Sequence, residues 1–531
     1  MSAGQPLAFG VFVMPMPFDG EEFTFHNPDG TSFKVRGSGN QFYATFETED
    51  GFTIVKCETS REWRFAEAAA DGAQLVASSL APGRDDPSAA GLAQHLRPSH
   101  EVAKADALRS QMISGRRRWE DRWAERVMAK KAAPGGPFAA PPSGPTTGTF
   151  VGLCVLIDFP DVAGTISQNE VTKYCNDVGY SGFGNNGSVR DYFFDVSDGK
   201  LTYTNIVTAY YTAQNNRSYY TDETVSFGTR ARELITEALD DLVANGFDFS
   251  GLTADGLGFI HALNVFYAGD RVNNWAEGLW PHSWSLASAY NIGGGRKFFD
   301  YQFTNMGDEL TLGTFCHENG HMICDFPDLY DYGYESRGTG RYSLMSSSGN
   351  PKNPVQIDAY LKHAAGWTSN LTTLAPGMTA TVNAGQNDFC IFPRSDTEYF
   401  IIENRQQTGR DTALPDSGLA IWHVEESGSN NNEQMTAALH YECSLEQADG
   451  NFDLENNSNS GDSTDLFPAS GITEFDDATT PNSKWWDGTS SGLEVSNISA
   501  SSNTMTFQVG GAAVATSPAL TGVYKLLLLS A

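Results

Sequence analysis

Two histidines and a glutamate stand close together in the sequence His-Glu-Asn-Gly-His at residues 317–321. Residues four apart lie on one face of an α-helix, so a helix here would place His317, Glu318 and His321 within one sector about 100° wide. The opposite side of that helix would carry apolar side chains, at Leu312, Phe315, Cys316, Met322 and Ile323. The HExxH pattern therefore predicts a helix that packs one face on a core and directs two imidazoles and a carboxylate into a cleft.

The chemistry that this pattern favours is hydrolysis at a zinc ion. Catalytic zinc usually takes three protein ligands and leaves a fourth position to water, which can lose a proton near neutral pH. His317 and His321 are the candidate ligands. Glu318, one residue from the first ligand, is badly placed to bind the same ion and is the candidate general base. The alternative is a helix with two surface histidines, because the motif also occurs by chance.

The candidate for the third ligand is a carboxylate beyond the helix. Many HExxH enzymes place a ligand ten residues after the first histidine, but that position is Pro327, whose side chain cannot bind a metal. Because the residue before a proline is biased out of the α region, we expect the helix to break there and the chain to turn back. We favour Asp328. Asp325, Asp331 and Glu335 stay as alternatives, and Asp328 could instead be a turn or capping residue.

Composition limits the partners of the chain. Its 531 residues include 34 Lys and Arg against 65 Asp and Glu, a formal net charge of -31. Nucleic acids and anionic membranes bind clustered positive charge, so we expect neither as a partner. We also predict no membrane span, because no segment approaches the roughly 18 apolar residues that one needs.

The apolar N-terminal run has no basic residue before it and is interrupted by Pro15 and Pro17, so it is not interpreted as a signal peptide. The seven cysteines lie far apart and do not predict a disulfide framework.

The N-terminal part of the chain is predicted to contain a β-rich region followed by helix and linker. Residues 1–100 are interpreted as β-rich because Phe, Thr, Val and Ile alternate around Gly-containing turns within 20–85. Residues 101–147 are highly charged at first, which favours helix, and then rich in Pro and Gly, as in a linker. The arginines at 116–118 are interpreted as a solvated helix face, with a processing site as the alternative.

The remaining chain predicts an α/β (α+β) domain and a second β-rich one. The nearly continuous apolar run at 151–159 indicates a strand buried on both faces. Apolar residues at helical spacing follow within 231–242. We therefore expect a mixed sheet with helices packed on it at 148–375, and short strands forming a sandwich-like C-terminal domain at 376–531.

Several sequence blocks resemble one family. HENGHMICDFPDLYD and GRYSLMSSSGNP, together with LCVLIDFPD, LWPHSW, QIDAYLKHAAGW and LAIWHVEE, are similar to the immune inhibitor A-like family of secreted zinc metallopeptidases, which are related to the metzincins. The resemblance extends over nearly the whole chain. It implies a metzincin-like catalytic domain that cuts internal bonds of protein and peptide substrates. It also implies secretion and synthesis as a zymogen, with residues 1–147 as the inhibitory pro-region.

The resemblance assigns roles to particular residues. It implies that His317, His321 and a downstream aspartate bind zinc and that Glu318 is the general base. Met345 is then the methionine of the turn beneath the metal, a buried packing residue and not a ligand. The family usually has Gly seven residues after the first histidine, with Pro-Asp ending ten after it. Here Cys324 stands at the seventh position and Pro-Asp comes one residue later, so Asp328 is the expected equivalent.

Other residues are weaker candidates. Some metzincins carry a tyrosine two residues after the methionine, where this chain has Ser347, so an oxyanion-stabilising side chain must come from elsewhere. His282 is the candidate, and a buried hydrogen-bonded histidine is the alternative. Cys57 could cap the zinc in a latent zymogen or simply be a packing residue. A Gly- and Asn-rich loop is predicted to bind calcium, with solvated turns as the alternative, through Asp449, Asp453, Asp462 and Asp465.

Two other functions fit the same residues. A zinc-containing binding or adhesion protein without catalytic activity would bind the metal but turn nothing over. The presence of Glu318 counts against it, because a protein that has lost catalysis is free to lose its general base. A zinc aminopeptidase would prefer substrates with a free α-amine. No pattern predicts an oligomeric state or a cleavage preference.

Overall fold

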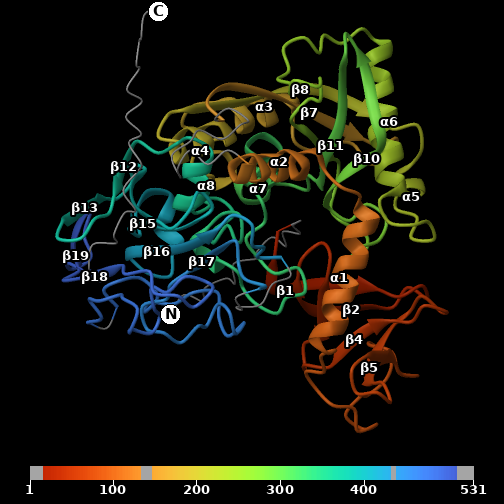
Figure 1. The fold of residues 1–531 in the computed structure, drawn as a ribbon. Helices are drawn as coiled ribbons and strands as arrows, with labels where there is room; N and C mark the ends of the chain where they lie inside the picture. Colours follow the sequence, from red (N-terminus) through yellow and green to blue (C-terminus); the bar gives the residue numbers. More distant parts are fainter. Residues whose placement is uncertain (1–15, 133–145, 432–437, 470, 511–531) are drawn as a thin grey trace, which may run out of the picture.

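The computed structural model describes residues 16–132, 146–431, 438–469 and 471–510. Residues 133–145, which belong to the predicted linker, lie outside this description. Along the chain there follow an N-terminal sheet, a pair of helices, a mixed sheet covered by further helices, and a pair of smaller sheets (Figure 1).

The N-terminal sheet is antiparallel, and its strands are neighbours in the order in which they occur in the sequence. Side chains alternate between its faces, so that Phe23 and Phe25 are buried in the same aromatic core while Thr24 is exposed. This is the β-rich region that the alternating pattern predicts. Its strands are β1 (Phe18–His26), β2 (Ser32–Gly39), β3 (Ala44–Thr48), β4 (Thr53–Lys56), β5 (Trp63–Ala68) and β6 (Leu75–Ala77).

Two helices connect this sheet to the rest of the molecule. Helix α1 (His100–Ser114) leads away from the sheet, and helix α2 (Arg118–Ala132) packs against α7 (Leu312–Cys324) of the next part (Figure 1). The charged segment is therefore helical, as predicted.

The mixed sheet has the strand order β10-β11-β9-β7-β8. Neighbouring strands run parallel except at the edge, where β10 is antiparallel to β11. Together with the helices beside it, this sheet confirms the predicted α/β (α+β) class. Its strands are β7 (Gly148–Asp158), β8 (Leu201–Thr212), β9 (Leu263–Tyr267), β10 (His282–Gly293) and β11 (Arg296–Asn305).

Strand β7 shows why the sheet is covered on both faces. Cys154 and Leu156 belong to one hydrophobic core, whereas Leu153, Val155 and Ile157 belong to another. The first core contains α3, α4 and α7, and the second contains α6. The helices of this part are α3 (Gln168–Asn176), α4 (Val189–Val196), α5 (Arg217–Tyr220), α6 (Thr229–Ala244), α7 and α8 (Ala359–Ala364), with short 3-10 turns at η1 (Gly182–Gly184) and η2 (Gly340–Tyr342).

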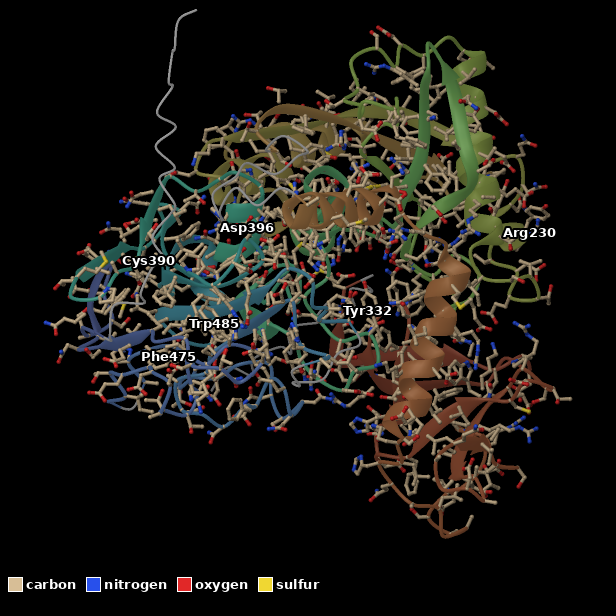
Figure 2. The ribbon with its side chains drawn as sticks, viewed as in Figure 1. Arg230, Tyr332, Cys390, Asp396, Phe475 and Trp485 are labelled. Atoms are coloured by element: carbon tan, nitrogen blue, oxygen red, sulfur yellow. The ribbon has the colours of Figure 1, made fainter. Side chains whose placement is uncertain are left out.

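The C-terminal part consists of two sheets, ordered β12-β14-β15-β16-β17 and β13-β19-β18. A core between them includes Phe400, Phe475 and Trp485; Figure 2 labels the last two. The strands, with one 3-10 turn, are β12 (Asn370–Thr373), β13 (Thr379–Asn383), β14 (Asp388–Pro393), β15 (Glu398–Arg405), η3 (Gly409–Ala413), β16 (Gly418–Glu425), β17 (Cys443–Leu445), β18 (Glu494–Ser496) and β19 (Thr504–Gly510).

The larger C-terminal sheet also packs on the part that holds α7. Ile401 and Trp422 share a hydrophobic core with Phe315 of α7 and Tyr360 of α8. The seven cysteines all lie in the described residues and are free thiols. None of the described helices has the length and apolar character needed to cross a membrane.

Candidate metal centre

Helix α7 carries the two histidines and the glutamate, as HExxH predicts. It ends where Asp325 adopts a left-handed backbone conformation, with φ of 60°, and donates its N–H to the carbonyl of His321 at 2.9 Å. The helix therefore stops before Pro327, and the chain turns back toward the histidines. The aspartate that reaches them is Asp328.

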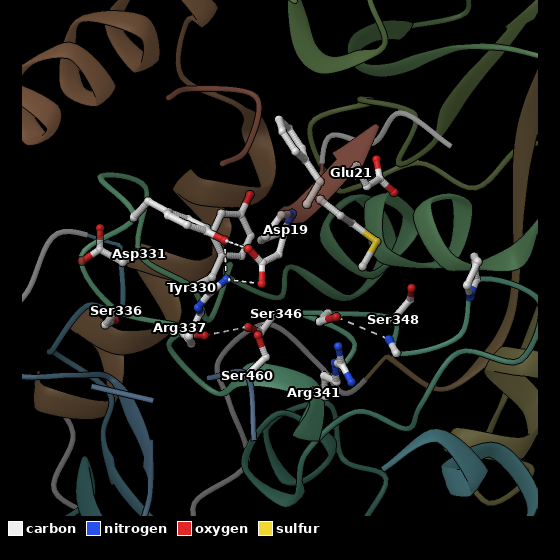
Figure 3. A pocket seen from close by; sticks show the side chains of 18 residues that line it. Asp19, Glu21, Tyr330, Asp331, Ser336, Arg337, Arg341, Ser346, Ser348 and Ser460 are labelled. Carbon is white, nitrogen blue, oxygen red and sulfur yellow. Dashed lines mark hydrogen bonds and ion pairs between the residues drawn. The ribbon is translucent and has the colours of Figure 1, made fainter. Parts of the chain in front are cut away.

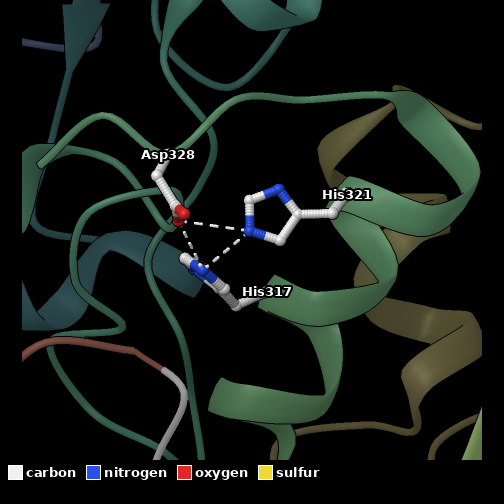
Figure 4. Close-up of side chains that lie close together, drawn as sticks. All are labelled: His317, His321 and Asp328. Carbon is white, nitrogen blue, oxygen red and sulfur yellow. Dashed lines mark hydrogen bonds and ion pairs between the residues drawn. The ribbon is translucent and has the colours of Figure 1, made fainter. Parts of the chain in front are cut away.

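Three side-chain atoms converge beside α7 (Figure 4). His317 Nε2 and His321 Nε2 lie 3.0 and 3.1 Å from Asp328 Oδ1, and the two nitrogens lie 3.1 Å from each other. All three side chains are buried, with at most 2% of each residue exposed. The structure thus brings together the three residues that the sequence favours as ligands.

The outer nitrogens of the two imidazoles fix the direction of the inner ones. His317 Nδ1 lies 2.9 Å from the carbonyl of Leu344, and His321 Nδ1 lies 2.5 Å from the carbonyl of Phe326. A carbonyl oxygen only accepts, so each Nδ1 carries the hydrogen and each neutral ring presents an Nε2 lone pair. With both rings neutral, two lone pairs and a carboxylate oxygen meet with no hydrogen between them. Such a set of donors fits a bound cation, and its chemistry and number fit zinc.

Charge within the centre is balanced among the same three residues. Burial lowers the pKa of His317, but the hydrogen bond and charge of Asp328 outweigh this and raise it above the usual value. Burial raises the pKa of Asp328, but the charges of His321 and His317 in their protonated forms, with the hydrogen bonds that these rings then donate, outweigh that effect and hold the pKa well below its usual range. Without a metal, a proton can therefore take the place of the cation. Asp328 is therefore an ionised carboxylate held between two imidazoles.

The loop that carries Asp328 is held by distant segments. The Leu329 N–H donates to the carbonyl of Met345 at 2.8 Å. The side-chain amide of Asn431, which follows β16, donates to the carbonyl of Asp328 at 3.0 Å. The backbone carbonyl of Asn431 accepts the N–H of Tyr332 at 2.9 Å. The third candidate ligand thus depends on contacts that no local sequence pattern specifies.

Glu318 faces the same centre and is buried. Its Oε1 lies 3.9 Å from His317 Nε2. Its Oε2 has no hydrogen-bond partner among the residues that the structure describes. A buried carboxylate oxygen beside the converging ligands is available to accept a proton, as the proposed general base requires.

Met345 lies beneath α7 and is fully buried. A Cβ atom on Gly320, in the middle of the HExxH segment, would lie only 2.9 Å from Met345 Sδ. The contact is therefore possible because residue 320 is glycine. This packing agrees with the expected position of the methionine below the imidazoles, and its functional role stays a prediction.

The alternative third ligands are engaged elsewhere. Asp325 Oδ1 accepts a hydrogen bond from Arg122 Nε at 2.8 Å. Asp331 Oδ1 accepts the Gly333 N–H at 2.7 Å, and burial raises the pKa of Asp331 to about 7. Glu335 lies 3.7 Å from a ring nitrogen of His100. Asp328 alone of these four carboxylates belongs to the group around the histidines.

His282 is placed in an aromatic environment at the start of β10. Its Nδ1 lies 2.7 Å from the carbonyl of Trp280 and its Nε2 lies 2.9 Å from the hydroxyl of Tyr301. Burial lowers its pKa to about 4, so the ring is neutral at physiological pH. These contacts are those of the alternative, a buried hydrogen-bonded histidine, and a role in oxyanion binding stays a prediction.

The predicted calcium ligands come together only in part. Asp449, Asp462 and Asp465, here called the acid cluster, have carboxylate oxygens within 4.8 Å of one another, whereas Asp453 is not part of this group. Thr464 Oγ1 lies 2.6 Å from Asp449 Oδ2 and 2.7 Å from Asp462 Oδ1. Calcium binding stays a prediction.

Sequence reasoning missed a side chain that lies directly on the metal centre. The indole of Trp119, in the first turn of α2, stacks on the imidazole of His321, with ring centroids 4.5 Å apart and an angle of 18° between the planes. The neighbouring Arg117 is buried, with its guanidinium 4.8 Å from the Trp119 ring centroid, so the solvated-face interpretation is wrong for this arginine. Cys57 lies in the turn after β4, and its role as a cap on the zinc stays a prediction, whereas Trp119 does contact a candidate ligand.

A mixed sheet beside a buried helix that presents two imidazoles and a carboxylate defines a candidate metal-dependent hydrolase. Comparison with protein families identifies which one: residues 151–352 match the catalytic domain of immune inhibitor A peptidase M6. The match confirms the resemblance over this part of the chain and supports a metallopeptidase. The match begins in β7 and extends past Met345, so it includes the whole metal centre. Comparison with curated proteins found no match.

Proposed function

We propose that the protein is a zinc-dependent endopeptidase, with His317, His321 and Asp328 as the residues that hold the ion. The observation that carries this proposal is the meeting of two Nε2 lone pairs and one carboxylate oxygen about 3 Å apart. A zinc ion bound there would supply Lewis acidity to a water molecule and a substrate carbonyl. The family match supports a peptidase reaction at this place.

The side chains around the centre have separate tasks. Leu344 and Phe326 hold the imidazoles through backbone carbonyls, which keeps both Nε2 atoms directed inward. Glu318 Oε2 takes a proton from the attacking water and delivers it to the leaving amine nitrogen. Because this carboxylate is buried and its Oε2 is unpartnered within the described part of the chain, the proton transfer needs no prior release of another contact.

The intact chain is proposed to be a zymogen, because residues 16–132, here called the N-terminal region, place a side chain on the metal centre. Trp119 stacks on His321, and its helix is fixed by Asp300, whose carboxylate accepts the N–H groups of Arg118 at 2.9 Å and Trp119 at 3.3 Å. These hydrogen bonds satisfy free N–H groups at the start of α2. Further along this helix, Trp123 Nε1 donates to Glu442 at 3.1 Å.

The N-terminal region also occupies the surroundings of the site. The backbone N–H of Ser283, on edge strand β10, donates to Gln41 of the N-terminal region at 3.1 Å. A cavity of about 260 Å³ is lined by Met16, Asp19 and Glu21 together with residues 346–349, which follow Met345 (Figure 3). A substrate that approached along these surfaces would have to displace the N-terminal region. Secretion is proposed from the family resemblance alone.

The test is a peptidase assay on casein and on peptides with blocked ends, before and after limited proteolysis of the full chain. We expect cleavage after proteolysis that a zinc chelator abolishes and added zinc restores. Glu318→Gln should lower the rate by about 10²- to 10⁴-fold while zinc stays bound. Glu233→Gln, on α6 and paired with Arg230, is the matched control and should leave the rate unchanged.

The same assay separates the alternatives. An aminopeptidase would cleave only peptides with a free α-amine. A non-catalytic binding protein would hold zinc and cleave neither substrate after any treatment. Equal rates for Glu318→Gln and the native chain would refute the proposed role of this carboxylate.

A further inference from the structure

The two oxygens of Asp328 have different partners. Oδ1 faces His317 Nε2 at 3.0 Å and His321 Nε2 at 3.1 Å. Oδ2 accepts a hydrogen bond from the hydroxyl of Tyr332 at 2.7 Å. A hydrogen bond from a phenol to an ionised carboxylate is of the strong, charge-assisted kind. One oxygen is therefore directed to the imidazoles while the other is held by the phenol.

Tyr332 is itself held by several contacts, and only 4% of it is exposed. Its backbone N–H donates to the carbonyl of Asn431 at 2.9 Å, and its carbonyl accepts the amide of Asn40 at 3.1 Å. Its ring lies 4.6 Å from that of Phe42 and 5.3 Å from that of Tyr330. Figure 2 shows Tyr332 near the middle of the molecule, where these segments meet.

The position of the phenol matters because of how a carboxylate can bind a metal. A carboxylate can bind through one oxygen or through both, and a catalytic zinc site needs a position left open for water. If both oxygens of Asp328 were free to turn toward the ion, the second would compete for that position. The Tyr332 hydrogen bond occupies Oδ2 and so restrains the carboxylate from rotating.

We propose that Tyr332 is a positioning residue of the metal centre, which presents Asp328 to the metal through Oδ1 by holding Oδ2 with its hydroxyl. The inference rests on the proposed zinc function of the same site. It assigns to Tyr332 no contact with substrate. Its contacts with Asn40 and Phe42 also connect the third ligand to the N-terminal region, so the two are held by one continuous set of side chains.

The experiment compares two tyrosine-to-phenylalanine variants of the full chain, both made with Glu318→Gln so that no chain is cut during measurement. Tyr332→Phe removes the hydroxyl that holds Asp328. Tyr360→Phe is the matched control, because Tyr360 is also buried and donates its hydroxyl to a carboxylate, Glu442, at 2.6 Å. Zinc affinity is measured by competition with a chelator, and the visible absorption spectrum is recorded with cobalt in place of zinc.

We expect Tyr332→Phe to weaken zinc binding by about 10- to 100-fold, the usual cost of losing a partner of a ligand. Its cobalt spectrum should change, because the carboxylate can then bind in another way. Tyr360→Phe should keep both the affinity and the spectrum of its parent. Zinc should also raise the unfolding temperature less in Tyr332→Phe than in Tyr360→Phe, since stabilisation by a ligand follows its affinity.

Unchanged affinity and an unchanged cobalt spectrum in Tyr332→Phe would overturn the inference and leave the zinc function standing. Equal losses in both variants would also overturn it, because they would show a general effect of removing a buried hydroxyl. A parent chain that binds no zinc at all would refute the proposed function itself, and the role of Tyr332 with it.

Discussion

The metal centre and the acid cluster each bring three potential metal ligands together. They differ in how far the ligand atoms are already satisfied by hydrogen-bond donors of the protein. In the metal centre, the backbone orients both imidazoles through Nδ1, and when both rings are neutral the inner atoms meet one another without a hydrogen between them. In the acid cluster, most of the oxygens that meet already have donors, although Asp465 Oδ1 has none among the residues that the structure describes. Asp465 Oδ2 accepts the hydroxyl of Tyr342 at 2.9 Å and the N–H of Asp462 at 2.8 Å.

The difference teaches that proximity of ligating groups is a weak sign of a site. The side chains of the metal centre are buried, so the meeting of acceptors there is costly unless a cation joins them. Asp449 and Asp462 are partly exposed and bonded to Thr464, so water and neighbouring donors can satisfy them. The metal centre therefore needs an ion for its own stability more than the acid cluster does.

The largest expected effect comes from removing one ligand from each place. His317→Ala should lose bound zinc and lower peptidase activity by more than about 100-fold, because losing a ligand should cost more than losing a partner of a ligand. Asp462→Ala should keep both the zinc content and the activity of the processed enzyme. Metal content by elemental analysis and the rate on a blocked peptide measure the two outcomes. Zinc loss in Asp462→Ala would show that the acid cluster contributes to zinc binding after all.

The second expected effect concerns Trp119, which stacks on a candidate ligand of the metal centre. In the intact chain, Trp119→Ala should raise the rate on a short peptide by roughly 30-fold, the effect of removing a contact worth about 2 kcal/mol. Trp119→Phe should raise it less, since an aromatic ring can still lie on His321. Met128→Ala, at an exposed position of the same helix, is the control and should change nothing.

A further outcome would contradict this account of latency. If proteolysis activates the chain but Trp119→Ala does not, the block must come from other contacts, such as the one between Gln41 and β10. If proteolysis removes the N-terminal region and the rate stays the same, the chain is not a zymogen.

The sequence predicted the parts of the site that local geometry controls. The spacing of His317, Glu318 and His321 requires only a helix, and the proline at 327 required the chain to leave it, which made Asp328 the favoured third ligand. The mixed sheet followed from apolar runs such as 151–159, whose alternate residues do face two cores.

Some contacts that hold this site could not be predicted, because they join residues more than 100 positions apart. Trp119 reaches His321 from the N-terminal region, and Asn431 reaches the Asp328 loop from the C-terminal part. A single tyrosine four residues after Asp328 carries no periodic signal either. A clue did exist in Trp119 and Trp123, two large apolar side chains on a charged helix, which implies that one face of α2 is covered.

The smallest expected effect concerns stability and the acid cluster. Burial raises the pKa of Asp465 to about 7, and the charges of Asp462 and Asp449 add to this. The unfolded chain would bind that proton only near pH 4. The folded chain therefore binds more protons between about pH 4 and 7, so the contribution of Asp465 to stability is lost as the pH rises through this range. The side chain of Asp465→Asn does not titrate. The free energy of unfolding of this variant, relative to that of the native chain, should therefore be about 1–2 kcal/mol larger at pH 8 than at pH 5, after allowance for solvent screening.

Urea unfolding at the two pH values, in calcium-free buffer with zinc present, measures this gain. Asp462→Asn is the control, because the hydrogen bond from Thr464 lowers the pKa of Asp462. That carboxylate is ionised in both the folded and the unfolded chain at pH 5 and at pH 8, so the effect of Asp462→Asn on stability should be the same at the two pH values. Calcium is the decisive addition. A bound calcium ion would neutralise the acid cluster, so calcium would stabilise the native chain more than Asp465→Asn and would reverse the order of the two at pH 8. That reversal would mean that the acid cluster, like the metal centre, is completed by a cation, and the contrast between the two would then be one of metal type.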